Sequence, residues 1–222
     1  MKNFFRYIFT ILFIVISFGR GYAQEPPFYQ EIQAFKSKDS ISFPPKHAIL
    51  FVGSSSFRKW VDVQNYFPGY TIINRGFGGS TLPDVIRYTD DIIFPYQPKQ
   101  IVIYCGENDF AESDTVTAQL VFTRFKHLFQ LIRNKMPVVP IAFVSIKPSP
   151  SRLRLMQKMA EGNLMIKKYL KGKKNASFID VYHKMLNKDG KPRKDIFIED
   201  NLHMNAKGYK IWQGIIKPYL IN

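Results

Sequence analysis

The segment Ala48-Ile49-Leu50-Phe51-Val52-Gly53 is followed at once by three serines, Ser54-Ser55-Ser56. An uncharged run of this length, rich in β-branched and aromatic side chains, is typical of a strand that is buried on both faces of a parallel sheet. The serines stand where such a strand would end and a helix would begin. Because parallel sheets bind ligands at the carboxyl edge of their strands, the segment predicts both a fold class and a place for chemistry.

Apolar runs of strand length and longer helical patterns alternate along the rest of the chain. Strands are predicted at 47–54, 70–74, 100–105, 138–146 and 177–181. Helical spacing is found at 82–93, around 121–132, at 151–170 and after Asn205, a good N-cap. Alternating strands and helices imply right-handed crossovers, and therefore an α/β fold with a three-layer α/β/α sandwich of about five parallel strands.

The first 23 residues have the layout of a secretory signal peptide. Lys2 and Arg6 precede a nearly unbroken apolar run from Ile8 to Phe18, and small residues follow up to Ala23. The run is short for a membrane span of about 20 residues, so we expect cleavage after Ala23 and a secreted or periplasmic protein. An uncleaved anchor is the alternative. Residues 24–222 would then form a single domain with no stable membrane insertion.

The chain is strongly basic, with 32 lysines and arginines against 17 acidic residues. Three basic residues and no acidic one lie in the signal segment, which leaves a formal excess of +12 on residues 24–222. A solvated basic face is one reading, and attraction to an anionic surface such as an acidic glycan or lipid headgroups is the other. Nucleic acid is a poor candidate partner, because export would separate the protein from such a target and no recognition motif is present.

The cysteine and histidine content excludes other classes of chemistry. Cys105 is the only cysteine, so no intrachain disulfide can form, and its apolar neighbours indicate a small buried side chain. The four histidines include no H-x-x-x-H pair or carboxylate cluster with ligand spacing, which disfavours a metal enzyme.

Near the end of the chain, Asp200 and His203 form a D-x-x-H pair. A turn of this length can fold the carboxylate onto the Nδ1 side of the imidazole and leave Nε2 free. A serine hydroxyl is a poor nucleophile until a base takes its proton and a carboxylate orients that base. With the serines that follow the first strand, the pair predicts a serine hydrolase, although the serines alone could simply cap a helix.

Two other segments follow predicted strands. Gly79 lies in a glycine-rich loop at 74–81, which either forms a turn that requires positive φ or brings a backbone amide close to a substrate. Asn108, in Gly106-Glu107-Asn108-Asp109, is either a turn residue or a carboxamide donor for an oxyanion hole.

Taken together and in this order, these segments resemble the conserved blocks of the SGNH hydrolases, also called the GDSL esterase family. The resemblance implies a flavodoxin-like fold, no metal or organic cofactor, and the following assignments: Ser55 as nucleophile, His203 as base, Asp200 as its partner, and an oxyanion hole formed by the Ser55 and Gly79 amides and the Asn108 side chain. Ser54 stands where the family's G-D-S motif has aspartate, as in a subgroup with Gly-Ser-Ser-Ser. That aspartate is not the triad acid, so the change affects loop geometry and substrate preference rather than catalysis.

The expected function is a secreted serine esterase that cleaves short, acetyl-type esters, with a sugar as the alcohol part, through an acyl-serine intermediate. Little chain remains for a large lid beyond 24–45 and the turn at 148–150, so each added acyl methylene would gain little of the ~0.8 kcal/mol that burial supplies. Trp60, Phe77 and Phe110 could stack on a sugar ring or pack into the core. The alternatives are an acyltransferase, a lysophospholipase-like lipase, and a non-catalytic carbohydrate-binding protein.

Overall fold

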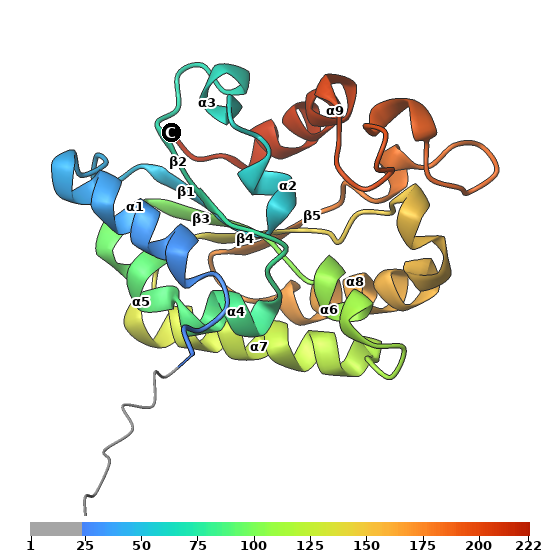
Figure 1. Ribbon diagram of the computed structural model, residues 1–222, viewed down its shortest axis with the longest axis horizontal. Helices are drawn as coiled ribbons and strands as arrows, with labels where there is room; N and C mark the ends of the chain where they lie inside the picture. Colours follow the sequence, from blue (N-terminus) through green and yellow to red (C-terminus); the bar gives the residue numbers. More distant parts are fainter. Residues whose placement is uncertain (1–23) are drawn as a thin grey trace, which may run out of the picture.

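The computed structural model describes residues 24–222, and the signal peptide predicted at 1–23 lies outside them (Figure 1). Five parallel strands form one sheet in the order β2-β1-β3-β4-β5. The strands are β1 Ile49–Gly53, β2 Ile72–Gly76, β3 Gln100–Tyr104, β4 Ile141–Val144 and β5 Ala176–Ile179. Each strand predicted from the sequence is present, and the predicted α/β/α sandwich is confirmed.

Helices cover both faces of the sheet, and the layers are visible in Figure 1. One face carries α1 Tyr29–Ile41, α4 Leu82–Arg87, α5 Thr89–Ile92, α6 Glu107–Glu112, α7 Ala118–Lys135 and α8 Met156–Leu170. The other face carries α2 Ser55–Arg58, α3 Val63–Tyr66 and α9 Ala206–Ile216. Short 3-10 helices occur at Phe94–Tyr96, Pro150–Leu155, His183–Met185, Lys194–Ile196 and Lys217–Tyr219.

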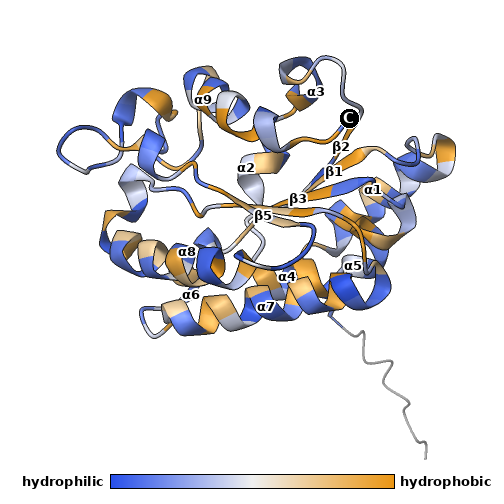
Figure 2. Cartoon of the chain, turned by 180° about the vertical axis from the view of Figure 1, so that it is seen from behind, coloured by the Kyte–Doolittle hydropathy of each residue, from blue (hydrophilic) through white to orange (hydrophobic). Residues whose placement is uncertain are grey.

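The sheet separates two hydrophobic cores. Successive strand residues point to opposite faces, so Leu50 and Val52 pack under α4 and α7, while Ile49 and Phe51 pack under α2 and α9. Both faces are covered, which explains why the first strand is a continuous apolar run rather than an alternating one. Figure 2 shows mixed hydrophobic and hydrophilic bands along α7, as expected for an amphipathic helix with one face on the core.

Helix α1 was not predicted, because its sequence has no apolar periodicity and Ile32 is its only buried residue. Polar contacts hold it in place instead. Glu31 pairs with Arg58, Lys36 with Asp91 and Asp39 with Arg75. Helix α1 therefore occupies much of the segment 24–45, which the sequence left as a candidate wall for an acyl pocket.

Two details of the fold bear on chemistry. The side chain of Asn205 accepts hydrogen bonds from the Lys207 and Gly208 amides, so it caps α9 as predicted and fixes the chain just after His203. Cys105 is buried and unpaired, and burial raises the pKa of its thiol well above the ordinary value.

Within residues 24–222, no helix has both the length and the apolar character needed to cross a bilayer.

Candidate active site

The three consecutive serines differ sharply in accessibility. Ser54 and Ser56 are 2% and 1% exposed, whereas Ser55 is half-buried at the first position of α2. Gly53 makes this turn, with φ of 135° and its backbone so close to the Tyr104 carbonyl that a Cβ would clash. Only Ser55 of the three therefore presents its side chain at an open surface.

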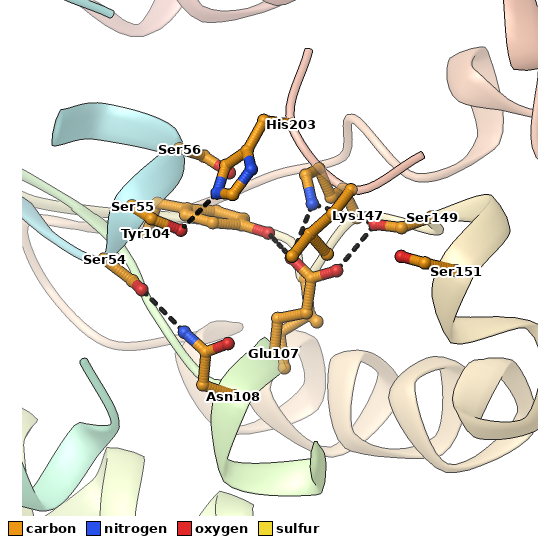
Figure 3. A network of polar contacts seen from close by, with 12 residues as sticks. Ser54, Ser55, Ser56, Tyr104, Glu107, Asn108, Lys147, Ser149, Ser151 and His203 are labelled. Atoms are coloured by element: carbon orange, nitrogen blue, oxygen red, sulfur yellow. Dashed lines mark hydrogen bonds and ion pairs between the residues drawn. The ribbon is translucent and has the colours of Figure 1, made fainter. Parts of the chain in front are cut away.

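Ser55 and the D-x-x-H pair meet across 148 residues of sequence. The His203 Nε2 atom lies 3.0 Å from Ser55 Oγ, and His203 Nδ1 lies 2.6 Å from Asp200 Oδ2. The other carboxylate oxygen of Asp200 accepts the backbone amides of Leu202 and His203 at 2.9 and 2.8 Å. The turn folds the acid back onto the base, as the sequence predicted, and the three residues form a continuous hydrogen-bonded relay. Figure 3 shows its contact between His203 and Ser55.

Hydrogen bonding sets the charge state of the acid. Burial raises the pKa of the Asp200 carboxyl, but the His203 ring and the His203 and Leu202 amides outweigh this effect and lower the pKa to about 2. Asp200 is therefore a carboxylate at every physiological pH, and it favours the imidazole tautomer with a proton on Nδ1. That tautomer leaves Nε2 able to accept the Ser55 proton.

Gly79 and Asn108 lie next to each other beside Ser55. Gly79 is exposed in the loop after β2, and a Cβ placed on it would lie 3.8 Å from Asn108 Nδ2. The Asn108 amide donates to Ser54 Oγ at 2.8 Å and to the Ser80 carbonyl at 3.2 Å. The structure thus brings together all the residues that the sequence predicted, but Asn108 already has a partner in Ser54 (Figure 3).

A buried polar cluster that the sequence did not predict adjoins these residues (Figure 3). The Glu107 carboxylate accepts hydrogen bonds from Lys147 Nζ at 2.5 Å, Ser149 Oγ at 2.6 Å and Tyr104 OH at 2.8 Å. Lys147 and Ser149 are fully buried and Glu107 is 5% exposed. Burial lowers the pKa of Lys147, against the opposing effect of the Glu107 charge. A lysine that ends an apolar run, directly after 138–146, was the available signal.

The suggestion that three aromatic side chains stack on a sugar ring is wrong. Trp60, Phe77 and Phe110 are all fully buried, so none of them can stack on a ligand. Trp60 packs its ring on Tyr209 at 4.8 Å within the core under α9, which is the alternative that the sequence left open.

No cluster of three or more metal-ligating side chains occurs within residues 24–222. Among the surface hollows, one of about 780 Å³ lies between α3 and α9 and is lined in part by Arg193, Lys207 and Lys210. Another, of about 220 Å³, lies beside α8 and β5. Neither includes Ser55 or His203 in its lining.

The chain is similar to known proteins in sequence and in fold. The sequence model of the GDSL-like lipase/acylhydrolase family matches residues 39–211, and no curated protein matches the chain. A GDSL-like lipase from Bacteroides thetaiotaomicron has 22% identity and a TM-score of 0.72 over 85% of this chain and 96% of that chain. A lipolytic G-D-S-L family member from Veillonella parvula has 18% identity and a TM-score of 0.63 over 77% and 96%. An acetylxylan esterase from Geobacillus stearothermophilus has 15% identity and a TM-score of 0.60 over 79% and 94%.

Proposed function

The chain belongs to the GDSL-like lipase/acylhydrolase family, and on this premise we propose that it is an exported serine esterase that removes acetyl-type groups from carbohydrate. Membership of the family makes it a carboxylic-ester hydrolase. The observation that carries the proposal is the relay from Asp200 through His203 to Ser55, which ends on the only accessible hydroxyl of the three serines.

Acylation begins at the Ser55 hydroxyl. Ser55 Oγ forms a bond to the acyl carbon while its proton passes to His203 Nε2, 3.0 Å away, and the carbonyl electron pair moves onto the oxygen. The Asp200 carboxylate stabilises the imidazolium without accepting its proton. When the tetrahedral intermediate collapses, the bond to the alcohol breaks and Nε2 gives its proton to the leaving oxygen. Water then repeats the sequence on the acyl-serine and releases the acid.

The developing oxyanion is bound by the Ser55 amide, the Gly79 amide and the Asn108 side chain. Ser55 is the first residue of α2, so its amide has no acceptor within the helix, and Gly79 is exposed and has no side chain to obstruct its amide. A negatively charged oxygen is a stronger acceptor than a hydroxyl, and Asn108 therefore exchanges Ser54 Oγ for the oxyanion. One such donor contributes ~2.7–4 kcal/mol to the reduction of the barrier.

A short acyl group fits the surroundings of Ser55. The segment 24–45 is largely used by α1, and the turn at 148–150 is held by the buried cluster around Glu107, so neither is free to form a long acyl wall. The similarity of fold to an acetylxylan esterase supports acetyl-carbohydrate as the class to test first. The basic charge of residues 24–222 suits a substrate or surface that is anionic.

Export rests on the sequence of residues 1–23 and is tested by N-terminal sequencing of the protein from its native host. A first residue of Gln24 in the periplasmic or extracellular fraction supports the proposal. An intact Met1 on membrane-bound protein identifies residues 1–23 as an anchor instead.

The substrate is tested by incubating residues 24–222 with acetylated xylooligosaccharides, acetylated uronate-containing oligosaccharides, lysophospholipid and p-nitrophenyl acetate. We expect Ser55-dependent release of acetate from at least one acetylated carbohydrate. Hydrolysis of lysophospholipid alone would replace the proposal by a lipase function. The same reactions with glycerol in excess, analysed for acetylated glycerol, identify transfer to an alcohol.

A further inference from the structure

Lys147 is a charged residue with no contact with solvent, and it lies at the carboxyl end of β4 facing Glu107. Removing two charges from water carries a large desolvation cost, and well-packed apolar residues of similar size commonly give equal or greater stability at such places. Fold stability alone therefore does not account for this pair. The residues that contact it on two sides suggest what it does.

On one side, Glu107 directly precedes Asn108 in the first turn of α6. Three donors on two segments hold its carboxylate, namely Tyr104 OH at the end of β3, and Lys147 Nζ and Ser149 Oγ in the segment that follows β4. The backbone that carries Asn108 is thereby fixed relative to two strands of the sheet. Asn108 Nδ2 is thus held against Ser54 Oγ and close to Gly79, the residue whose amide is proposed to share the oxyanion hole.

On the other side, the same segment reaches the turn that carries the acid and the base. Lys147 Nζ donates to Ser149 Oγ at 2.8 Å, and two residues later Ser151 donates to the Asn201 carbonyl from both its amide and its hydroxyl, at 3.1 and 3.0 Å. Asn201 directly follows Asp200. Pro148 and Pro150 restrict the backbone in between, so the 147–151 segment acts as a stiff connection.

A third contact leads to the same turn. The Lys147 ammonium lies 5.8 Å from the centre of the Phe197 ring. Phe197 pairs with Met204 in an antiparallel bridge, and the neighbouring Ile198 amide donates to the His203 carbonyl at 2.9 Å. The cluster of Glu107, Lys147 and Ser149 therefore contacts both the segment of the oxyanion donor and the hairpin of the base.

We propose that Glu107, Lys147 and Ser149 are positioning residues that hold Asn108 and the Asp200–His203 turn in register with Ser55. This inference rests on the proposed function, because it assigns the cluster a role in that reaction. None of the three residues touches the substrate. They act by keeping Asn108 Nδ2 and His203 Nε2 at their distances while the negative charge moves from Ser55 to the oxyanion.

The steady-state constants distinguish this positioning role from a purely structural one. An oxyanion contact that is made mainly in the transition state changes kcat and leaves KM nearly constant. Lys147→Met leaves Glu107 buried without its cation, so we expect a lower melting temperature as well as a lower kcat. The double variant Glu107→Met/Lys147→Met removes both charges, and we expect it to recover the melting temperature while kcat stays at least about 10-fold below wild type.

The coupling to Asn108 gives a second measurement that needs only a mild change. Ser149→Ala removes one donor to Glu107 and is expected to lower kcat about threefold to tenfold in an otherwise wild-type protein. In an Asn108→Ala background the same change should have a smaller effect, because the donor that the cluster positions is gone. The matched control is Arg133→Met. Arg133 binds the Val139 and Asn175 carbonyls at the opposite, amino-terminal edge of the sheet, so this variant should lose stability and keep its kcat.

Wild type and Ser55→Ala are assayed beside these variants on p-nitrophenyl acetate. If wild type shows no Ser55-dependent hydrolysis, the proposed function fails and the positioning role falls with it. If that activity is present, the positioning role alone is overturned by a double variant that recovers kcat along with its melting temperature. It is equally overturned if Ser149→Ala lowers kcat by the same factor with and without Asn108.

Discussion

Asn108 Nδ2 donates a hydrogen bond to Ser54 Oγ at 2.8 Å, which joins the proposed oxyanion donor to the residue just before the proposed nucleophile. Ser54 is buried, and it occupies the position at which the G-D-S motif has an aspartate. A neutral hydroxyl holds the amide less strongly than a carboxylate would. The hydrogen bond to Ser54 therefore holds Asn108 in place, and in the proposed reaction Asn108 can exchange this acceptor for the oxyanion.

This hydrogen bond predicts that replacing either of the two buried serines by alanine has a mild effect on kcat. Ser54→Ala removes the resting acceptor of Asn108 but leaves its Nδ2 donor, so kcat should fall by less than about tenfold. Ser56→Ala removes a buried hydroxyl that does not contact His203 and should have a similarly mild effect on kcat. Steady-state kinetics on p-nitrophenyl acetate measure both. A loss of about 10³-fold in Ser54→Ala would show that Ser54 takes part in the chemistry directly.

Asn108 itself should be a large contributor. Asn108→Ala is expected to lower kcat by about 10²- to 10³-fold with little change in KM, because the hydrogen bond to the oxygen strengthens as its charge develops. Asn108→Asp keeps the size but replaces a donor by a negative charge, so it should be at least as damaging. An Asn108→Ala protein that lost affinity and kept its kcat would place this side chain in substrate binding instead.

The rate should rise with pH from the acidic side. The pKa of Asp200 is about 2, so its carboxylate is already ionised across the whole assay range and contributes no limb of its own. Only the neutral imidazole of His203 can accept the Ser55 proton, so kcat/KM should be lowest at the acidic end of the range and rise from there. Profiles of kcat/KM between about pH 4 and 9 test this. A rate that fell steadily with rising pH would contradict the base role of His203.

Replacing the acid is a separate test of the relay. Asp200→Asn should lower kcat by up to about 10⁴-fold, because the imidazole then loses the carboxylate that fixes its tautomer.

Acyl length is a further test of the site's shape. In a p-nitrophenyl ester series from about two to twelve acyl carbons, kcat/KM should be highest for the shortest members, since added methylenes gain little burial. The comparison uses each ester below its critical micelle concentration. A maximum at about eight carbons or more would require an apolar channel beside Ser55 and would favour a lipase.

The sequence was sufficient for the parts of the molecule that follow from periodicity and turn chemistry. The five strands were identified from their apolar runs, and each end of an observed strand lies within three residues of the predicted end. The relay was predictable because Asp200 and His203 lie three residues apart, so a single turn fixes their contact. Helix α1 was missed because ion pairs with distant residues, rather than an apolar stripe, hold it on the sheet.

Other features depend on tertiary packing that a single sequence does not reveal. Lys147 follows an apolar run and is followed by proline, a pattern that is usual for an exposed strand end, and only the fold places Glu107 opposite it. The burial of Trp60, Phe77 and Phe110 has the same origin, because their positions beside the site in sequence do not determine the side to which they point. In both cases residues far apart in the chain decide the environment.

The central claim is that Ser55 is the nucleophile, and the most direct measurement is the kcat of Ser55→Ala on p-nitrophenyl acetate beside that of Ser56→Ala. We predict a loss of about 10³-fold or more for Ser55→Ala, an unchanged melting temperature, and near wild-type turnover for Ser56→Ala. Full activity in Ser55→Ala together with inactivity of a folded Ser56→Ala protein would contradict the claim, because the reactive hydroxyl would then lie one residue further along the chain.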